Sequence, residues 1–145
     1  MRVFDAPDLA LHRPATASSS ETASLGPENA TDGDPGSRWA SAYHNGEWIQ
    51  VDLGRAQPVR RVLLDWETAS GQDYDIQVSD DGVKWKTAAA VRDKPAGARV
   101  DDLTYAPASG RYVRMQGIKR TSSFGCSLRR FEVRAASPES NLLRR

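Results

Sequence analysis

The stretch EWIQVDLG, residues 47–54, decides the fold class because its side chains alternate between apolar and polar types. In an extended chain the apolar set shares one face and the polar set shares the other: Ile49, Val51 and Leu53 against Trp48, Gln50 and Asp52. A period of two is typical of a strand with one buried face and one solvated face. We therefore predict a β-strand at this position.

The same period recurs along the chain. It predicts further strands in VRRVLLDWE, DYDIQVS and RYVRMQG, at residues 59–67, 73–79 and 111–117. Turn signals punctuate the chain: Asp32-Gly33, Asn45-Gly46, Asp81-Gly82, Pro95–Gly97 and Pro107–Gly110. No stretch shows sustained helical periodicity, and only GPENATDG, residues 26–33, is expected to form one short helical turn. About eight short strands without intervening helices predict an antiparallel sandwich or barrel.

The last predicted strand lies in SFGCSLRRFEV, residues 123–133, and its pattern contains a conflict. Strict alternation places Leu128 and Arg130 on one face and Arg129 and Phe131 on the other. Each face then mixes apolar and charged side chains. The sequence does not explain how an arginine shares a face with a core leucine.

The composition excludes several classes of protein. The 145 residues are enough for one domain, and 39% hydrophobic with 27% charged residues allow a buried core and a solvated surface. The net charge of +1 lacks the basic excess of a nucleic-acid-binding domain. The single cysteine, Cys126, permits no intrachain disulfide and is expected to be a buried, inert thiol. No apolar run approaches the ~20 residues of a membrane span, and the N-terminus lacks an apolar core of the signal-peptide kind.

Several motifs occur in order and resemble a known superfamily: NATDGDPGSRWASA, EWIQVDLG, DYDIQVSDDGVKW and GRYVRM. They resemble the discoidin, or coagulation factor type C, superfamily, and within it the family 32 carbohydrate-binding modules. The resemblance implies an all-β, single-domain jelly-roll β-sandwich of about eight antiparallel strands, of the galactose-binding-like type. It covers residues 9–135, so residues 1–8 and 136–145 are expected to be flexible extensions.

A narrower resemblance rests on SSSETA, SRWASAY, DWETASGQDYDIQVS, VDDLTYAPASGRYVRM and KRTSSFGCSLRRFEV. These motifs are similar to modules appended to bacterial chitosanases and β-glucanases, which bind glucan or chitosan-type chains with loops at one end of the sandwich. The resemblance implies sugar contacts at five positions: Glu21, Tyr43, Glu67, Arg120 and Phe124. The implied function is a non-catalytic module that binds a polysaccharide or oligosaccharide.

The chemistry of these five residues agrees with that function. The two loop carboxylates can accept hydrogen bonds from hydroxyl groups or pair with a glucosamine ammonium. Exposed rings at Tyr43 and Phe124 can cover the C–H face of a pyranose, and the Arg120 guanidinium can bridge two sugar oxygens. The alternative for each is an ordinary surface side chain or a ring folded over the core. The four tryptophans are expected to pack in the core or at its seams: Trp39, Trp48, Trp66 and Trp85.

Enzymatic activity is not expected. A glycosidase needs an acid and a base or nucleophile across a cleft, and a sandwich of this size leaves little room for one. A serine or cysteine hydrolase needs a histidine base, but His12 and His44 have no nucleophile at a recognisable spacing. One cysteine and two distant histidines do not make a zinc site.

The resemblance also implies a structural calcium site at NATDGDPGS, residues 29–37. Carried over by position, its ligands are Asn29, Asp32, Asp34, Ser37 and, from the last strand, the carbonyl of Arg129. The family's closing glutamate is replaced by Arg130, so no cofactor is expected to be required. Two outcomes remain open: Arg130 pairs with Asp32 as a built-in cation, or it turns away and leaves a weak calcium site.

The partner expected from the resemblance is a glycan, with neither nucleic acid nor membrane, bound by a monomeric module of a larger, secreted enzyme. A cytoplasmic location is not excluded. Two alternatives stay open: a module that binds galactose or N-acetylhexosamine through Arg120, His44 and loop acids, or a discoidin-type module that adheres to protein or phospholipid.

Overall fold

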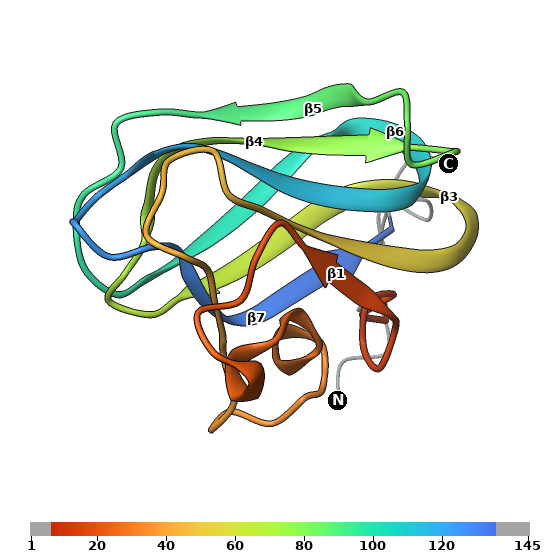
Figure 1. Ribbon diagram of the computed structural model, residues 1–145. Helices are drawn as coiled ribbons and strands as arrows, with labels where there is room; N and C mark the ends of the chain where they lie inside the picture. The colour runs from red at the N-terminus through yellow and green to blue at the C-terminus, as the bar shows by residue number, and fades with distance from the viewer. Residues whose placement is uncertain (1–6, 136–145) are drawn as a thin grey trace.

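A computed structural model describes residues 7–135, which form a two-layer antiparallel β-sandwich (Figure 1). The predicted all-β, galactose-binding-like fold is confirmed. Seven strands follow one another along the chain: β1 (Ala15–Ala17), β2 (Trp39–Ala40), β3 (Trp48–Trp66), β4 (Gly71–Ser79), β5 (Lys86–Val91), β6 (Arg99–Arg120) and β7 (Ser127–Arg134). Two 3₁₀ helices, η1 (Ala23–Leu25) and η2 (Pro27–Ala30), lie between β1 and β2. The predicted helical turn is therefore confirmed, and it begins at a proline.

The two long strands β3 and β6 belong to both layers. The first part of β3 pairs with β1 and with the last part of β6, where Ile49 faces Met115. The second part pairs with β7 and with the first part of β6, where Val62 lies between Leu103 and Val133. The pairing is irregular between Asp52 and Gln57, where both strands bend at the right-hand end of Figure 1. The structure therefore has seven strands, two of which bend and take part in both layers, where the pattern predicts about eight short ones.

Two boundaries differ from the prediction because these strands bend without breaking. The segments predicted as separate strands at 47–54 and 59–67 are the two parts of β3, joined through Gly54. Gly54 has a φ of 87°, and a Cβ atom there would meet the Arg13 guanidinium, so the bend requires glycine. The turn predicted at residues 107–110 lies inside β6, because Ala108 still pairs with Val59.

A β-bulge in β7 resolves the conflict in its sequence. Leu128 pairs with Trp66, but the next pair joins Arg130 to Asp65, so Arg129 is an extra residue without a partner in the ladder. The extra residue resets the alternation. Leu128 and Phe131 both point into the core, and Arg130 lies on the outer face.

The core between the layers contains one buried polar cluster. Trp66 and Tyr74 meet there with ring centroids 5.4 Å apart. The Trp66 Nε1–H and the Tyr74 hydroxyl both donate to Oδ2 of Asp101, at 3.1 and 2.5 Å. Arg99 pairs with the same carboxylate at 2.9 Å. Asp101 therefore holds residues of both layers together from inside.

The tryptophans divide into two pairs. Trp39 and Trp66 are fully buried, as predicted. Trp48 and Trp85 are half-buried on the outer face of the layer that contains β4, where the Arg114 guanidinium lies 4.3 and 4.0 Å from their ring centroids. Trp48 and Trp85 therefore lie outside the core, and cation–π contacts with Arg114 hold their rings.

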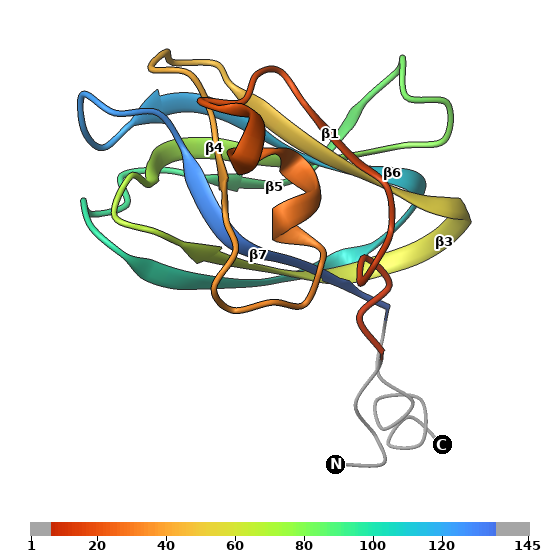
Figure 2. The ribbon, with the colours of Figure 1, turned by 60° about the horizontal axis from the view of Figure 1, so that its bottom comes forward.

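The short helices close the side of the sandwich between β1 and β7 (Figure 2). The described chain begins beside the far end of β7, because the Leu9 N–H donates to the Val133 carbonyl at 2.7 Å. Asp8, predicted to lie in a flexible extension, accepts the Val133 N–H at 3.0 Å. Residues 1–6 of that extension and residues 136–145 lie outside the described residues. No helix within residues 7–135 is long and apolar enough to cross a membrane.

Candidate functional site

Loops at the left-hand end of the sandwich in Figure 1 surround an open pocket of about 250 Å³. Four of the five predicted sugar-contact residues line it: Glu21, Tyr43, Glu67 and Phe124. They come from four segments: the one before η1 and the β2–β3, β3–β4 and β6–β7 loops. The fold thus gathers residues that are up to about a hundred positions apart in the sequence.

Two aromatic rings form one corner of the pocket. Tyr43 and Phe124 meet edge to face, with centroids 5.6 Å apart and an interplanar angle of 86°. They remain 48% and 56% exposed. Gly125 allows this contact, because a Cβ atom at that position would lie 2.5 Å from the Ala42 carbonyl oxygen. The corner offers an apolar surface that water covers in the free protein.

Glu21 is joined to this corner. Its carboxylate accepts a hydrogen bond of 2.5 Å from the Tyr43 hydroxyl. This hydrogen bond raises the pKa of the tyrosine, and desolvation raises it by a smaller amount. The Glu21 backbone N–H donates to the Ala40 carbonyl at 2.7 Å, which fixes the segment against β2. Glu21 is itself exposed and keeps oxygen atoms available to a ligand.

Glu67 lies on another wall of the pocket, directly after β3. Burial tends to raise its pKa, but the backbone N–H groups of Ala69 and Thr68 and the charge of Arg38 lower the pKa by a larger amount. The result is a pKa below the ordinary glutamate value. Its carboxylate is therefore ionised at neutral pH and can pair with a cation or accept a hydrogen bond from a hydroxyl group.

Arg38 is a pocket residue that the sequence prediction missed. It is half-buried, and its Nη1 donates to the Ser127 hydroxyl at 2.9 Å. Asn29 supports the arginine by donating to its carbonyl at 3.0 Å. The available signal was its place in the SRWASAY motif: Arg38 precedes the buried Trp39, so its side chain points away from the core. It adds a fixed positive charge to a pocket with two acids.

Arg120, the fifth predicted contact, does not line the pocket. Its Nη1 donates to the carbonyls of Ser123 and Phe124 at 3.1 and 3.3 Å, and its Nε donates to Asn45 at 3.1 Å. These bonds brace the β6–β7 loop against the β2–β3 loop. Arg120 supports the aromatic corner from behind.

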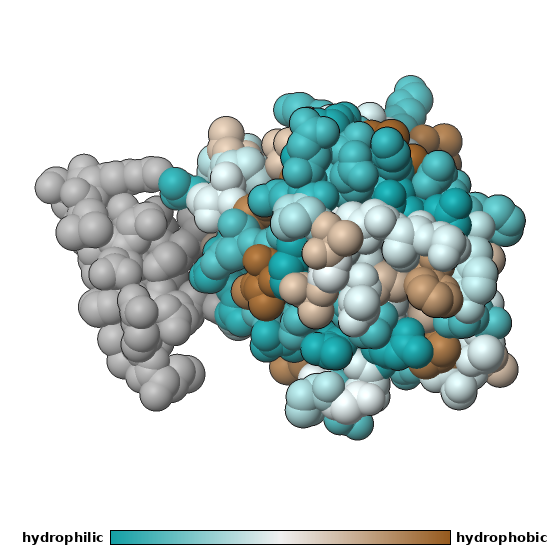
Figure 3. Space-filling model, turned by 90° about the vertical axis from the view of Figure 1, so that its left-hand side faces the viewer, coloured by the Kyte–Doolittle hydropathy of each residue, from teal (hydrophilic) through white to brown (hydrophobic). Residues whose placement is uncertain are grey.

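The pocket floor is small and neutral, with Ala40, Ser41, Gly125 and Cys126. Cys126 is buried, as predicted, and burial together with the nearby Glu47 carboxylate raises its pKa to about 12. The thiol is therefore not a nucleophile at neutral pH. Figure 3 faces this end of the molecule and shows small apolar patches among hydrophilic residues. Such a mixed surface suits a ligand with both hydroxyl groups and C–H faces.

In the loop expected to bind calcium, three of the oxygen atoms accept hydrogen bonds within the loop's own turns. Asp32 Oδ1 accepts the Asp34 N–H at 2.9 Å, and Asp34 Oδ1 accepts the Gly36 N–H at 2.8 Å. The Asp34 carbonyl accepts the Ser37 N–H at 3.1 Å. Within residues 7–135, no group of three or more His, Cys, Asp or Glu side chains is arranged to hold a metal ion. Calcium takes six to eight oxygen ligands, which include backbone carbonyls, and the calcium site stays a prediction.

Arg130 does not pair with Asp32, and the expectation of that pair is wrong. The bulge at Arg129 turns Arg130 to the outer face of β7. There it lies 3.6 Å from Asp65 and 3.0 Å from Glu132. With Gly33 it lines a surface cavity, so it remains beside the loop without binding its carboxylates.

Comparison with solved structures finds the same fold. Chitosan-binding module 1 of a chitosanase/glucanase from Paenibacillus sp. IK-5 is 41% identical, with a TM-score of 0.85 over 90% of this chain and 100% of the module. Module 2 of the same enzyme, solved with chitotriose, is 38% identical, with a TM-score of 0.84 over 88% of this chain and 100% of the module. A family 32 module from C. perfringens NanJ, solved with galactose, is 19% identical, with a TM-score of 0.74 over 84% of this chain and 93% of that module. That last similarity shows the fold alone.

No curated protein matches the chain. The sequence model of the F5/8 type C domain matches residues 14–131, which include every strand except the last residues of β7. The match agrees with the β-sandwich and with the resemblance noted from the motifs. The chain therefore belongs to the F5/8 type C, or discoidin, family.

Proposed function

We propose that this protein is a non-catalytic carbohydrate-binding module that binds a chitosan-type oligosaccharide in the end pocket. The observation that carries the proposal is the arrangement of Glu21 and Glu67 in one open pocket with the exposed rings of Tyr43 and Phe124. A glucosamine unit has an ammonium group, several hydroxyls and a C–H face. The pocket offers a complementary group for each of them.

Each interaction has a physical basis. A carboxylate and an ammonium form charge-assisted hydrogen bonds that are about twice as strong as neutral ones. The rings exclude water from the C–H face of the sugar, and the Arg38 guanidinium donates to a ring or hydroxyl oxygen. The pocket is open, so little area is buried and the affinity is modest.

The relatives support this proposal. Two modules that are 38–41% identical are described as chitosan-binding, and each is covered completely by this chain. Both derive from a chitosanase/glucanase. By analogy, this module acts as part of a larger extracellular enzyme. The β7 strand begins at the pocket with Ser127 and ends beside Leu9, so a neighbouring domain attached at the far end would leave the pocket open.

Glu67 does not suit the acid role that glycosidase catalysis requires. A glycosidase needs a carboxylic acid with a raised pKa to protonate the leaving group. The pKa of Glu67 is lowered, so its carboxylate stays ionised and does not donate a proton. We assign no catalytic step to this pocket.

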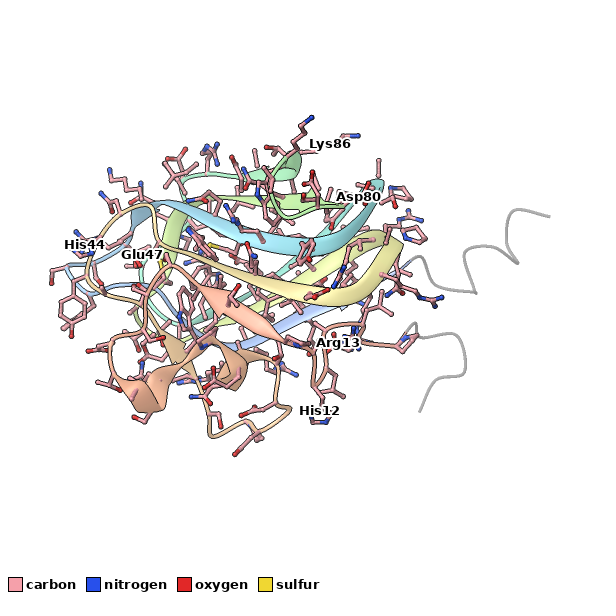
Figure 4. All side chains as sticks on the ribbon, turned by 45° about the vertical axis from the view of Figure 1, so that its right-hand side comes forward. His12, Arg13, His44, Glu47, Asp80 and Lys86 are labelled. Atoms are coloured by element: carbon pink, nitrogen blue, oxygen red, sulfur yellow. The ribbon has the colours of Figure 1, made fainter. Side chains whose placement is uncertain are left out.

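Calorimetric titration of the protein with chitotriose tests the proposal, with galactose and liposomes of anionic phospholipid as competing ligands. We expect binding to chitotriose that weakens with salt, because ionic contacts between exposed groups are screened. Asp80→Asn is the matched control for variants of the pocket acids Glu21 and Glu67. Asp80 is an exposed acid far from the pocket, at the other end of the molecule from His44 in Figure 4. Stronger binding to galactose or to liposomes would contradict the proposal.

A further inference from the structure

Glu47 is an ionisable residue behind the pocket that the proposed binding chemistry does not use. Its side chain is only 12% exposed, and it lies at the pocket end of the sandwich with His44 (Figure 4). One carboxylate oxygen accepts hydrogen bonds from the hydroxyls of Ser18, at 2.8 Å, and Ser19. The other lies 3.4 Å from Nδ1 of His44. A carboxylate this enclosed and this fully engaged holds its surroundings in place.

The two serines connect Glu47 to the segment that carries Glu21. Ser19 lies two residues before Glu21, and its hydroxyl also accepts the Ala42 N–H at 2.9 Å. Ala42 is the residue before Tyr43. The Ser18 hydroxyl accepts the Trp48 N–H at 2.8 Å, which joins the same segment to the start of β3.

Glu47 itself is fixed to the sheet. Its carbonyl accepts the Gly117 N–H from β6 at 2.9 Å. A Cβ atom at Gly117 would lie 2.5 Å from that carbonyl oxygen, so the approach of the two backbones requires glycine. The carboxylate is therefore a fixed point to which the segments that carry Glu21 and Tyr43 are joined.

We propose that Glu47 is a positioning residue of the glycan site, and that protonation of His44 tightens its hold on the loops that carry Glu21 and Tyr43. This inference rests on the proposed function and deepens it, because it gives the site a pH response. A protonated imidazole donates to the Glu47 carboxylate as the cation of an ion pair, which is a stronger contact than the hydrogen bond of a neutral imidazole N–H. The β2–β3 loop is then held more firmly in its binding conformation, and less conformational entropy is lost when the sugar binds.

The other groups around Glu47 do not compete for it. The Cys126 thiol, from the β6–β7 loop, stays protonated at neutral pH because burial and Glu47 raise its pKa to about 12. Arg120, at the end of β6, donates to Asn45 and to two loop carbonyls. The segment before η1 contributes only the hydroxyls of Ser18 and Ser19. His44 is the histidine beside Glu47, and histidine is the residue type that serves as a switch near neutral pH.

Three variants separate the two parts of the inference in titrations with chitotriose at pH 6 and pH 8. Glu47→Ala removes all three contacts, and we expect about tenfold weaker binding at both pH values, in line with the loss of one to two hydrogen bonds. Glu47→Gln keeps an oxygen for the serines but lacks the charge. We expect it to bind like the wild type at pH 8 and to lack the gain at pH 6. His44→Gln should behave in the same way.

The comparison between His44→Gln and the wild type corrects for the titration of the sugar amine, which is the same for both proteins. An unchanged affinity in Glu47→Ala would overturn the positioning role, and an unchanged pH profile in His44→Gln would overturn the role of the histidine. If Glu47→Ala does not fold, Ser19→Ala removes one of the three contacts, and unchanged binding there overturns the positioning role equally. Absence of wild-type binding would contradict the proposed function itself, which is a different result.

Discussion

The Tyr43 hydroxyl donates a hydrogen bond of 2.5 Å to the Glu21 carboxylate, across 22 positions of sequence. This bond joins an apolar surface and an acceptor at one corner of the pocket. Phe124 packs against the same tyrosine, so the corner is already assembled before a ligand arrives. A prearranged corner reduces the entropy lost on binding.

Phe124→Ala should weaken chitotriose binding about tenfold, which corresponds to ~1.4 kcal/mol. The ring is 56% exposed and contributes little to the core, so the melting temperature should change little. Val83→Ala is the matched control, because Val83 is a 78% exposed apolar residue in the β4–β5 hairpin, away from the pocket. Calorimetry and thermal melts of both variants check the prediction. Equal affinities of the two variants would show that Phe124 does not contribute to chitotriose binding.

The pH dependence of binding should reflect the lowered pKa of Glu67. Backbone hydrogen bonds and the Arg38 charge outweigh the effect of burial, so the carboxylate stays ionised as the pH falls through the ordinary value of 4.5. Binding to chitotriose should therefore persist at pH 4.5 and decline only at lower pH. Loss of affinity with a midpoint above pH 4.5 would contradict this assignment.

The same shift contributes to folding stability. The folded-state pKa of Glu67 is lower than the unfolded value, so its contribution is present above the unfolded value and is lost as the pH falls through the folded pKa. Glu67→Gln should accordingly make the melting temperature less dependent on pH below 4.5. Thermal melts between pH 3 and pH 6 measure this directly.

Asp101→Ala should destabilise the fold by roughly 3 kcal/mol, because it leaves the Arg99 guanidinium, only 13% exposed, without its carboxylate partner. Trp66 and Tyr74 also lose their acceptor. Asp102→Ala is the matched control. Asp102 pairs with Arg61 at 2.6 Å on the surface, where such a pair contributes about 1 kcal/mol or less. Urea unfolding of both variants is the measurement, and similar losses would show that the buried cluster has no special weight.

We predict that calcium does not stabilise the protein, because Asp32 and Asp34 each accept a hydrogen bond within the loop and Arg130, at the position of the family's glutamate, pairs with Asp65 and Glu132. Melting temperatures should agree in millimolar calcium and in chelator. A ligand that binds only the folded state must raise the melting temperature. A clear rise with calcium would mean that the loop rearranges into a metal site.

The fold was predictable from sequence because its strands alternate regularly and are separated by turn residues. Ile49, Val51 and Leu53 are buried as the pattern requires. The pattern failed at Arg129, since a bulge inserts one residue and local alternation does not reveal it. It also failed at residues 107–110, where proline and glycine lie within a bending strand and do not end it.

The site was predictable only in part. Glu21, Tyr43, Glu67 and Phe124 were expected to act together and do line one pocket. Arg38 was missed because alternation with Trp39 shows only that its side chain points outward, whereas its place at the pocket depends on the packing of β2 against β7. Glu47 was missed for a similar reason: its partners Ser18 and Ser19 are about 30 residues away in the sequence. Alternation in the sequence identifies the buried and exposed faces of a strand, whereas the contacts of Arg38 and Glu47 depend on which loops meet in the fold.

The central claim is that the acids and rings of the end pocket bind a cationic oligosaccharide. Calorimetric titration of the Glu21→Gln, Glu67→Gln double variant with chitotriose tests it most directly, with Asp80→Asn as the charge-loss control. We predict that the wild type and Asp80→Asn bind equally and that the double variant binds at least tenfold more weakly, since two charge-assisted contacts are lost. Equal binding by all three proteins, with a folded double variant, would contradict the claim.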